Sequence, residues 1–266
     1  MFVHADDGTR LYWEEHGAGE PLLMIPGFGC SVEIYCENAP ALAQRFRTIV
    51  LDPRGAGRSD SPQDGYTMER YAADCAAVLD AAGAGAAHVF GTSFGGMVAL
   101  HFALGYPQRT RGLVLACTTP GGAAHVAPPA ENMLRFMAAS HIEDPVESTR
   151  MRYPLHYSDA YAADHDAEII ARSLATAHMR PVEAGRAGQL AAVQAHDVAA
   201  RLGDIASPTL VAHGSDDGVI PVDNGRTLAA GIPGATLRIY DGARHVFFIE
   251  RAAEFNADVI AFLSGD

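Results

Sequence analysis

The stretch HVFGTSFGGMVAL, residues 88 to 100, joins a short apolar run to a helix-like pattern through a turn that contains three glycines. Glycine is a poor former of both helices and strands, so three of them within six residues need a structural reason. A serine in a sharp strand-to-helix turn needs small neighbours, because bulky side chains at 91 or 95 would clash in the bend. The stretch therefore predicts a turn that presents Ser93 at a helix N-terminus, where backbone N–H groups favour developing negative charge.

Short apolar strands and helical patterns alternate along most of the chain. After an N-terminal hairpin, strands are predicted at 21–26, 46–52, 86–91, 111–118, 207–214 and 235–240. Helices are predicted at 32–44, 68–82 with Thr67 as N-cap, 94–105, 223–231 and 250–263. This order favours an α/β fold with a mostly parallel central sheet and helices on both of its faces.

The alternation lapses between about residues 120 and 204, where helix-compatible pieces occur without a convincing buried strand. A sheet that is interrupted by helices and then resumes indicates a helical cap inserted over one end of the sheet. We therefore expect a core formed by residues 1–119 and 205–266, with a cap at 120–204.

Composition limits the classes of function. The chain has 266 residues, of which 48% are hydrophobic, and a net charge of −13, which disfavours nucleic acid and anionic membranes as partners. It has neither a basic segment followed by an apolar signal segment nor an apolar run of about 20 residues. Its four cysteines lack the spacing of a zinc site. We expect a cytoplasmic protein without a metal or an organic cofactor, whose oligomeric state stays open.

Loops that follow the predicted strands carry the remaining candidate groups, because ligand sites lie beyond the carboxyl ends of parallel strands. If Ser93 is a nucleophile, backbone N–H groups of Phe28, in the loop after PLLMIP, and of Phe94 could hold an oxyanion. The stretch LVAHGSDDGVIP supplies two neighbouring acids, Asp216 and Asp217, and either could orient a histidine. His245 follows the last strand, so the order along the chain is serine, acid, histidine.

The stretches IPGFG, LDPRGAGRSD, GTSFGG, HGSDDGVIP and GARH together resemble the α/β-hydrolase fold family, in its esterase and lactonase branch. They span residues 25 to 245, so the resemblance covers nearly the whole chain around a variable cap. The family pattern Gly-x-x-Asp-x-x-x-Pro implies that Asp217, and not Asp216, is the acid. The resemblance further implies that Asp52, Arg54 and Ser59 are structural. Pro26 stands where many relatives have a histidine, but a backbone donor at Phe28 does not require that side chain.

Residues 65 to 100 look especially like 3-oxoadipate enol-lactonase relatives, a group that also includes plain carboxylesterases. Ser93 speaks against the dehalogenase and epoxide-hydrolase chemistry of relatives that have an aspartate there. Relatives that cleave carbon–carbon bonds often carry a tryptophan after the histidine, where this chain has Val246. An apolar acyl pocket is predicted from cap and core-loop residues, namely Met133, Phe136, Met137, Tyr153, Val219 and Val246.

The sequence thus predicts a serine hydrolase that cleaves a small-molecule carboxylic ester through an acyl-enzyme, with Ser93, His245 and Asp217 as catalytic residues. A lactonase and a carbon–carbon bond hydrolase are the enzymatic alternatives. A hydrolase-like receptor that binds a small molecule without turnover is the alternative outside the enzymes.

Overall fold

The computed structural model describes residues 1–265 and contains one eight-stranded sheet with the strand order β1-β2-β4-β3-β5-β6-β7-β8. The strands are β1 (Phe2–His4), β2 (Arg10–His16), β3 (Glu20–Ile25), β4 (Phe46–Leu51), β5 (Ala87–Thr92), β6 (Thr110–Ala116), β7 (Thr209–Gly214) and β8 (Thr236–Tyr240). The pairs β1–β2 and β2–β4 are antiparallel, and all other neighbours are parallel. The predicted hairpin and mostly parallel sheet are confirmed.

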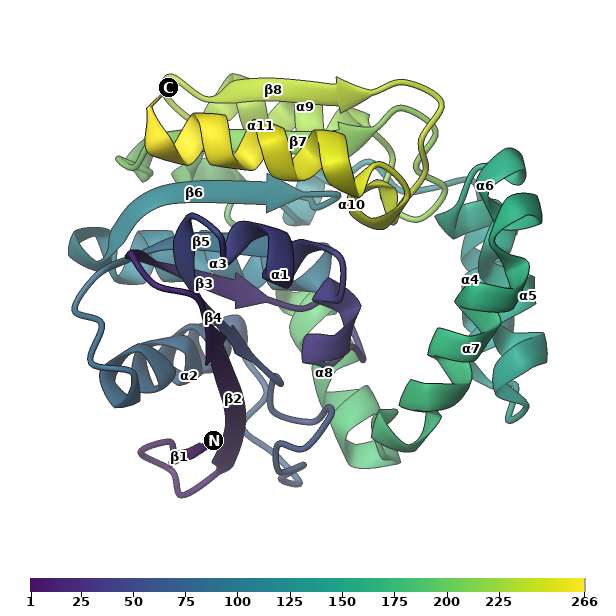
Figure 1. Cartoon of the computed structure of the whole chain (residues 1–266), viewed down its shortest axis with the longest axis horizontal. Helices are drawn as coiled ribbons and strands as arrows, with labels where there is room; N and C mark the ends of the chain where they lie inside the picture. The colour runs from purple at the N-terminus through teal and green to yellow at the C-terminus, as the bar shows by residue number, and fades with distance from the viewer. Residues whose placement is uncertain (266) are drawn as a thin grey trace.

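Helices cover both faces of this sheet (Figure 1). They are α1 (Asn38–Leu42), α2 (Met68–Ala81), α3 (Phe94–Gly105), α4 (Ala130–Ser140), α5 (Pro145–His156), α6 (Asp159–Asp164), α7 (Asp166–Thr176), α8 (Glu183–Ala195), α9 (Asp223–Gly231), α10 (Phe247–Glu250) and α11 (Ala252–Ser264). In Figure 1, α1 and α11 lie in front of the sheet, and α3 and α9 lie behind it. Thr67 caps α2 as predicted, because its hydroxyl accepts a hydrogen bond from the N–H of Arg70.

The core consists of two apolar layers separated by the sheet. Successive side chains of a strand point to opposite faces, so both faces can be buried only when a strand is continuously apolar. In β3, Leu23 and Ile25 belong to the layer beneath α2 and α3, whereas Leu22 and Met24 belong to the layer that includes residues of α1 and α11. The run PLLMI is continuously apolar because both faces of β3 are buried.

The predicted helix at 32–44 is divided in the structure. A short 3₁₀ helix, η1 (Val32–Tyr35), is followed by the five-residue helix α1. Pro40 explains the break, because proline has no N–H with which to continue a helix from the preceding turn and is tolerated only in a first turn. The predicted helical stretch near residues 32–44 is thus present as two short helices.

Between β6 and β7 the chain forms helices α4 to α8 and short 3₁₀ helices, with one isolated bridge, Gly121 to Asp197. Figure 1 shows α4 to α7 beside the carboxyl ends of β6, β7 and β8, which is where a cap was expected. The bounds 120–204 remain our proposal for this cap. Among residues 1–265, no helix has the length and apolar character that crossing a membrane requires.

Candidate active site

Ser93 lies between β5 and α3 with a backbone φ of 54° and ψ of −118°. A positive φ is uncommon for a residue with a side chain and is strained. The bend brings backbones so close that a Cβ on Gly95 would lie 2.0 Å from the Ile25 carbonyl oxygen, and one on Gly91 would lie 2.2 Å from the Gly95 oxygen. These contacts give the physical reason for the glycines that flank the serine.

The structure brings the three distant candidate side chains together. His245 Nε2 lies 3.1 Å from Ser93 Oγ, and His245 Nδ1 lies 2.8 Å from Asp217 Oδ2. Asp217 and His245 are both buried, whereas Asp216 is exposed and accepts a hydrogen bond from Ser215. Because carboxylates only accept hydrogen bonds, Nδ1 of His245 carries a proton, and Nε2 faces the Ser93 hydroxyl.

The Asp217 carboxylate is held by several donors besides His245. Its Oδ1 accepts hydrogen bonds from the backbone N–H groups of Val219 and Ile220, at 2.8 and 2.9 Å. Its Oδ2 lies 3.3 Å from Nε2 of the fully buried His213, which also donates to the Ile220 carbonyl. Burial raises the pKa of Asp217, but the contacts with His245 and His213 outweigh burial and hold the pKa well below its usual range. Asp217 is therefore ionised, and its negative charge can stabilise an imidazolium.

The two candidate oxyanion donors come from the start of α3 and from the loop after β3. Phe94 is the first residue of α3, where N–H groups have no partner within the helix. Phe28 follows Gly27, on which a Cβ would lie 3.6 Å from that of Ser93. Both phenylalanines and Ser93 line one cavity. The role of the two N–H groups as oxyanion donors stays a prediction.

The cap contacts the loop that carries His245 directly. The N–H of His245 donates to the Leu155 carbonyl, and that of Val246 donates to the carbonyl of His156, at the end of α5. The His156 and His245 rings lie 5.8 Å apart between centroids. Burial, and then the neighbouring charge of His245, lower the pKa of His156 to about 3, so His156 is neutral near pH 7. The sequence did not single out His156 or His213, because no local pattern distinguishes them from the other histidines.

A largely apolar cavity of about 340 Å³ opens at Ser93 between the core and the cap. Four of the predicted pocket residues line it, namely Met133, Phe136, Met137 and Val219. Tyr153 and Val246 are not among its lining residues, so placing them in the pocket was wrong. The Tyr153 hydroxyl donates instead to Asp166, and Val246 is buried in the core layer that includes α11.

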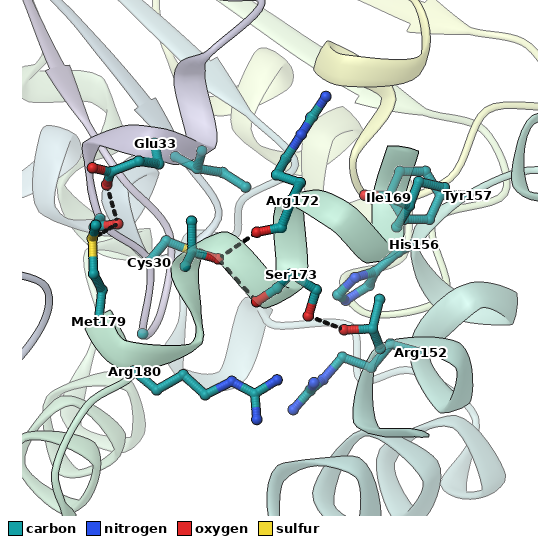
Figure 2. A pocket seen from close by; sticks show the side chains of 15 residues that line it. Cys30, Glu33, Arg152, His156, Tyr157, Ile169, Arg172, Ser173, Met179 and Arg180 are labelled. Atoms are coloured by element: carbon teal, nitrogen blue, oxygen red, sulfur yellow. Dashed lines mark hydrogen bonds between the residues drawn. The ribbon is translucent and has the colours of Figure 1, made fainter. Parts of the chain in front are cut away.

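A second, more polar cavity of about 220 Å³ is lined by residues of the cap and of the loop after β3 (Figure 2). Arginines from the cap line it, namely Arg152, Arg172 and Arg180. His156, at the end of α5, also lines it, as do Gly29 and Cys30, which directly follow Phe28 in the chain. No pattern in the sequence predicts this cavity.

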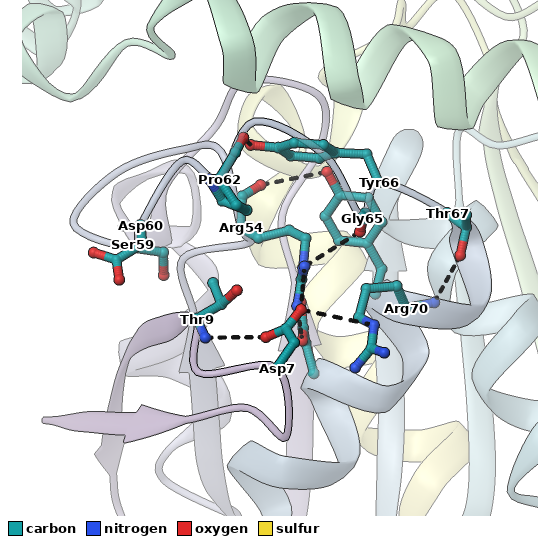
Figure 3. A network of polar contacts seen from close by, with 12 residues as sticks. Asp7, Thr9, Arg54, Ser59, Asp60, Pro62, Gly65, Tyr66, Thr67 and Arg70 are labelled. Carbon is teal, nitrogen blue, oxygen red and sulfur yellow. Dashed lines mark hydrogen bonds and ion pairs between the residues drawn. The ribbon is translucent and has the colours of Figure 1, made fainter.

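Asp52, Arg54 and Ser59 make contacts of a structural kind. Ser59 Oγ donates to the Asp52 carbonyl at 2.6 Å. The buried guanidinium of Arg54 donates two hydrogen bonds of 2.6 Å to Asp74 on α2 and a third, of 2.9 Å, to Asp7 in the N-terminal hairpin (Figure 3). Arg54 thus ties the hairpin to the core, in agreement with the role that the resemblance implied.

A family model described as the alpha/beta hydrolase fold matches residues 20–252. The chain belongs to the α/β hydrolase family. The predicted fold class and family are therefore confirmed.

This α/β hydrolase is 34% identical over 260 residues to a putative carbamate hydrolase, RutD, of Variovorax paradoxus (strain S110), with 96% of each chain covered. It is 30% identical over 266 residues to a 2-hydroxy-6-oxo-6-phenylhexa-2,4-dienoate hydrolase of Comamonas testosteroni, with 95% of this chain and 91% of that one covered. The solved enol-lactonase of Burkholderia xenovorans LB400 shares its fold, with a TM-score of 0.86, 24% identity and coverage of 99% and 100%.

Proposed function

We propose that this α/β hydrolase cleaves a small-molecule carboxylic ester, with Ser93 as nucleophile, His245 as general base and acid, and Asp217 as the group that orients His245. The observation that carries the proposal is the continuous chain of contacts from Asp217 Oδ2 through both ring nitrogens of His245 to Ser93 Oγ, at 2.8 and 3.1 Å. A serine hydroxyl is a weak nucleophile unless such a base removes its proton.

In the first half of the reaction, Ser93 Oγ attacks the ester carbonyl carbon as its proton passes to His245 Nε2. The electron pair of the carbonyl bond moves to oxygen, and the N–H groups of Phe28 and Phe94 donate hydrogen bonds to that oxyanion. The carbonyl then re-forms, the bond to the leaving alkoxide breaks, and Nε2 returns the proton to that oxygen. The acyl group remains on Ser93.

Water completes the reaction by the same route. The oxygen of a water molecule attacks the acyl carbon while His245 Nε2 accepts a proton from that water. The proton then passes to Ser93 Oγ as the bond between Ser93 Oγ and the acyl carbon breaks. The products are an alcohol and a carboxylic acid. Neither half of the reaction requires a metal or an organic cofactor. The proposed cellular location of the protein is the cytoplasm.

The substrate class is tested with 4-nitrophenyl esters of graded acyl length beside a panel of lactones. We expect nitrophenolate release from medium-length acyl esters, because the cavity at Ser93 is mostly apolar. Ser93→Ala should lower kcat by about a thousandfold or more while the folded structure remains, because the variant has no nucleophile. Faster turnover of lactones than of open esters would favour the lactonase alternative.

Two relatives point to other bonds. The Comamonas testosteroni relative is named for a dienoate substrate, and the Variovorax paradoxus relative for carbamates. Including that dienoate and a simple carbamate in the panel separates these activities from ester hydrolysis. A receptor would instead bind a ligand of the panel tightly and return it unchanged.

A further inference from the structure

Two guanidinium groups converge in the polar cavity without acidic partners. Figure 2 shows Arg152 and Arg180 pointing toward one another, whereas Arg172 turns away from both. Arg172 forms ion pairs with Glu37 and Glu168. Within residues 1–265, Arg152 donates only to Ser140, to Ser148 and to the Ser148 carbonyl, and no carboxylate lies within ion-pair distance of Arg152 or Arg180.

The other groups that line the cavity do not neutralise this charge. The Glu33 carboxylate accepts hydrogen bonds from Ser31 and Arg58, so it is already paired. Burial raises the pKa of the Cys30 thiol to about 11, so it is uncharged near pH 7. His156 is neutral as well. Burial, and then the nearby positive charge of Arg180, lower the pKa of Arg152. Like charges that face each other in a partly desolvated space favour an anion between them.

The cavity adjoins the proposed reaction centre. Phe28 lines the apolar cavity with Ser93, and the next two residues in the chain, Gly29 and Cys30, line the polar one. On the cap side, Arg152 lies 5.9 Å from the ring centroid of Phe136, which lines the apolar cavity. Residues 28–30 and the contact between Arg152 and Phe136 thus form walls of both cavities.

We propose that Arg152 and Arg180 form a subsite for a carboxylate carried by the substrate. This inference rests on the proposed ester hydrolysis and narrows its substrate class to esters with a free carboxylate, such as half-esters of dicarboxylic acids. The reacting carbonyl lies at Ser93 and Phe28, the carboxylate arm extends into the arginine cavity, and the apolar arm occupies the cavity lined by Phe136 and Met133. Arginine suits this role because its planar fork can donate two hydrogen bonds to one carboxylate.

The test compares mono-4-nitrophenyl adipate, which carries a free carboxylate, with its neutral methyl ester. The ratio of their kcat/KM values isolates recognition of the carboxylate from the chemistry. We expect wild type to favour the anionic ester by about tenfold or more, the usual range for hydrogen bonds to a charged group. Arg152→Gln should lower the ratio by about tenfold, and Arg180→Gln by about fivefold because Arg180 is more exposed.

Arg135→Gln is the matched control, because Arg135 is an exposed arginine of cap helix α4 that does not line the cavity. This variant should keep the wild-type ratio, which excludes a general effect of lowering the positive charge of the cap. Arg152 also bonds to serines within the cap, so Arg180→Gln tests the proposal even if Arg152→Gln unfolds. A wild-type ratio near one, or a ratio that Arg180→Gln leaves unchanged, would overturn the proposal.

Binding separates this proposal from the proposed function. Calorimetry on the Ser93→Ala variant, which cannot form an acyl-enzyme, should detect tighter binding of adipate than of neutral dimethyl adipate, and adding Arg180→Gln should weaken adipate binding by about fivefold. If neither nitrophenyl ester is hydrolysed but adipate binds in this way, ester hydrolysis is wrong and the anion site stands. If the esters are hydrolysed but adipate binding does not depend on Arg180, the subsite is wrong and the hydrolase proposal stands.

Discussion

Asp217 is held so that it accepts hydrogen bonds at both oxygens and from different directions. Backbone N–H groups of Val219 and Ile220 reach Oδ1, and His245 Nδ1 reaches Oδ2. His213 adds a further donor near Oδ2 from the buried strand β7. The motif HGSDDGVIP indicated the acid, but no sequence pattern reveals that the histidine before Gly214 faces it. That contact depends on how the loop after β7 folds back over its own strand.

Replacing Asp217 by asparagine should lower kcat by about a thousandfold or more. An amide that donates to His245 Nδ1 would require Nδ1 to be unprotonated, which places the proton on Nε2, where it blocks transfer from Ser93. Steady-state hydrolysis of a 4-nitrophenyl ester measures the effect, with KM expected to change little. Asp216→Asn is the control, because Asp216 is exposed and only Ser215 donates to it in the side-chain contacts described. Equal activities of the two variants would contradict the assignment of Asp217.

At the scale of elements, the turn from β5 to α3 could be predicted because its cause is local. Backbone crowding around Ser93 requires glycine at positions 91 and 95, and both glycines are visible in the sequence GTSFGG. The cap could not be predicted to the same depth. Its helices are bounded by ordinary helix signals, but the face that each helix turns toward the sheet depends on contacts distant in sequence. For this reason the sequence wrongly places Tyr153 in the apolar pocket, whereas its hydroxyl donates a hydrogen bond to Asp166. For the same reason no sequence pattern predicts the arginine cavity.

The crowding at Gly95 leads to a stability prediction. Gly95→Ala would place a Cβ 2.0 Å from the Ile25 carbonyl oxygen and 2.6 Å from that of Pro26, both of which are backbone atoms that cannot rotate away. We expect the free energy of unfolding to fall by about 1–3 kcal/mol, and ester hydrolysis to fall because the loop before Phe28 must shift. Urea unfolding and activity are the measurements.

Gly105→Ala is the control in the same helix, because its Cβ would meet no heavy atom within 4 Å. It should change the free energy of unfolding by less than about 1 kcal/mol, in the stabilising direction. A loss of stability in Gly105→Ala as large as that in Gly95→Ala would contradict the assignment of the effect to backbone crowding at Gly95.

At the scale of the whole molecule, hydrogen bonds join the chain at the start of the cap, residues 119–122, to His196 near its end. The His196 N–H group at Nε2 donates to the Thr119 carbonyl at 3.0 Å, and the His196 carbonyl accepts from the N–H of Gly122. Nδ1 of His196 lies 3.1 Å from Nε2 of His101 on α3. Burial is the largest cause that lowers the pKa of His196, to about 4. The junction between cap and core is therefore built on a neutral histidine.

This junction should make stability depend on pH. An unfolded histidine binds a proton near pH 6.5, whereas folded His196 does so only near pH 4, so between these values the unfolded state binds more protons. The free energy of unfolding should consequently decrease as pH falls from 6.5 toward 4, with a slope from this residue that approaches about 1.4 kcal/mol per pH unit.

Urea unfolding at several pH values between 7.5 and 4.5 measures the slope in wild type and in His196→Asn. Asparagine keeps a side-chain donor but does not titrate, so the variant should show a shallower decrease over the interval. The nearby groups His101, Glu69 and Asp197 are present in both proteins, so the difference in slope reports the titration of His196 together with its coupling to His101. Parallel slopes in the two proteins would show that His196 does not titrate as its burial implies.

Labelling with a fluorophosphonate tests the central claim most directly, because this reagent reacts with a serine only when a neighbouring base activates the hydroxyl. Peptide mass spectrometry of the treated wild-type protein should locate one adduct, on Ser93. Ser93→Ala should abolish the adduct, and His245→Ala should slow its formation by about a hundredfold or more while the protein remains folded. Folded wild-type protein that leaves Ser93 unlabelled, or that reacts equally fast without His245, would contradict the account.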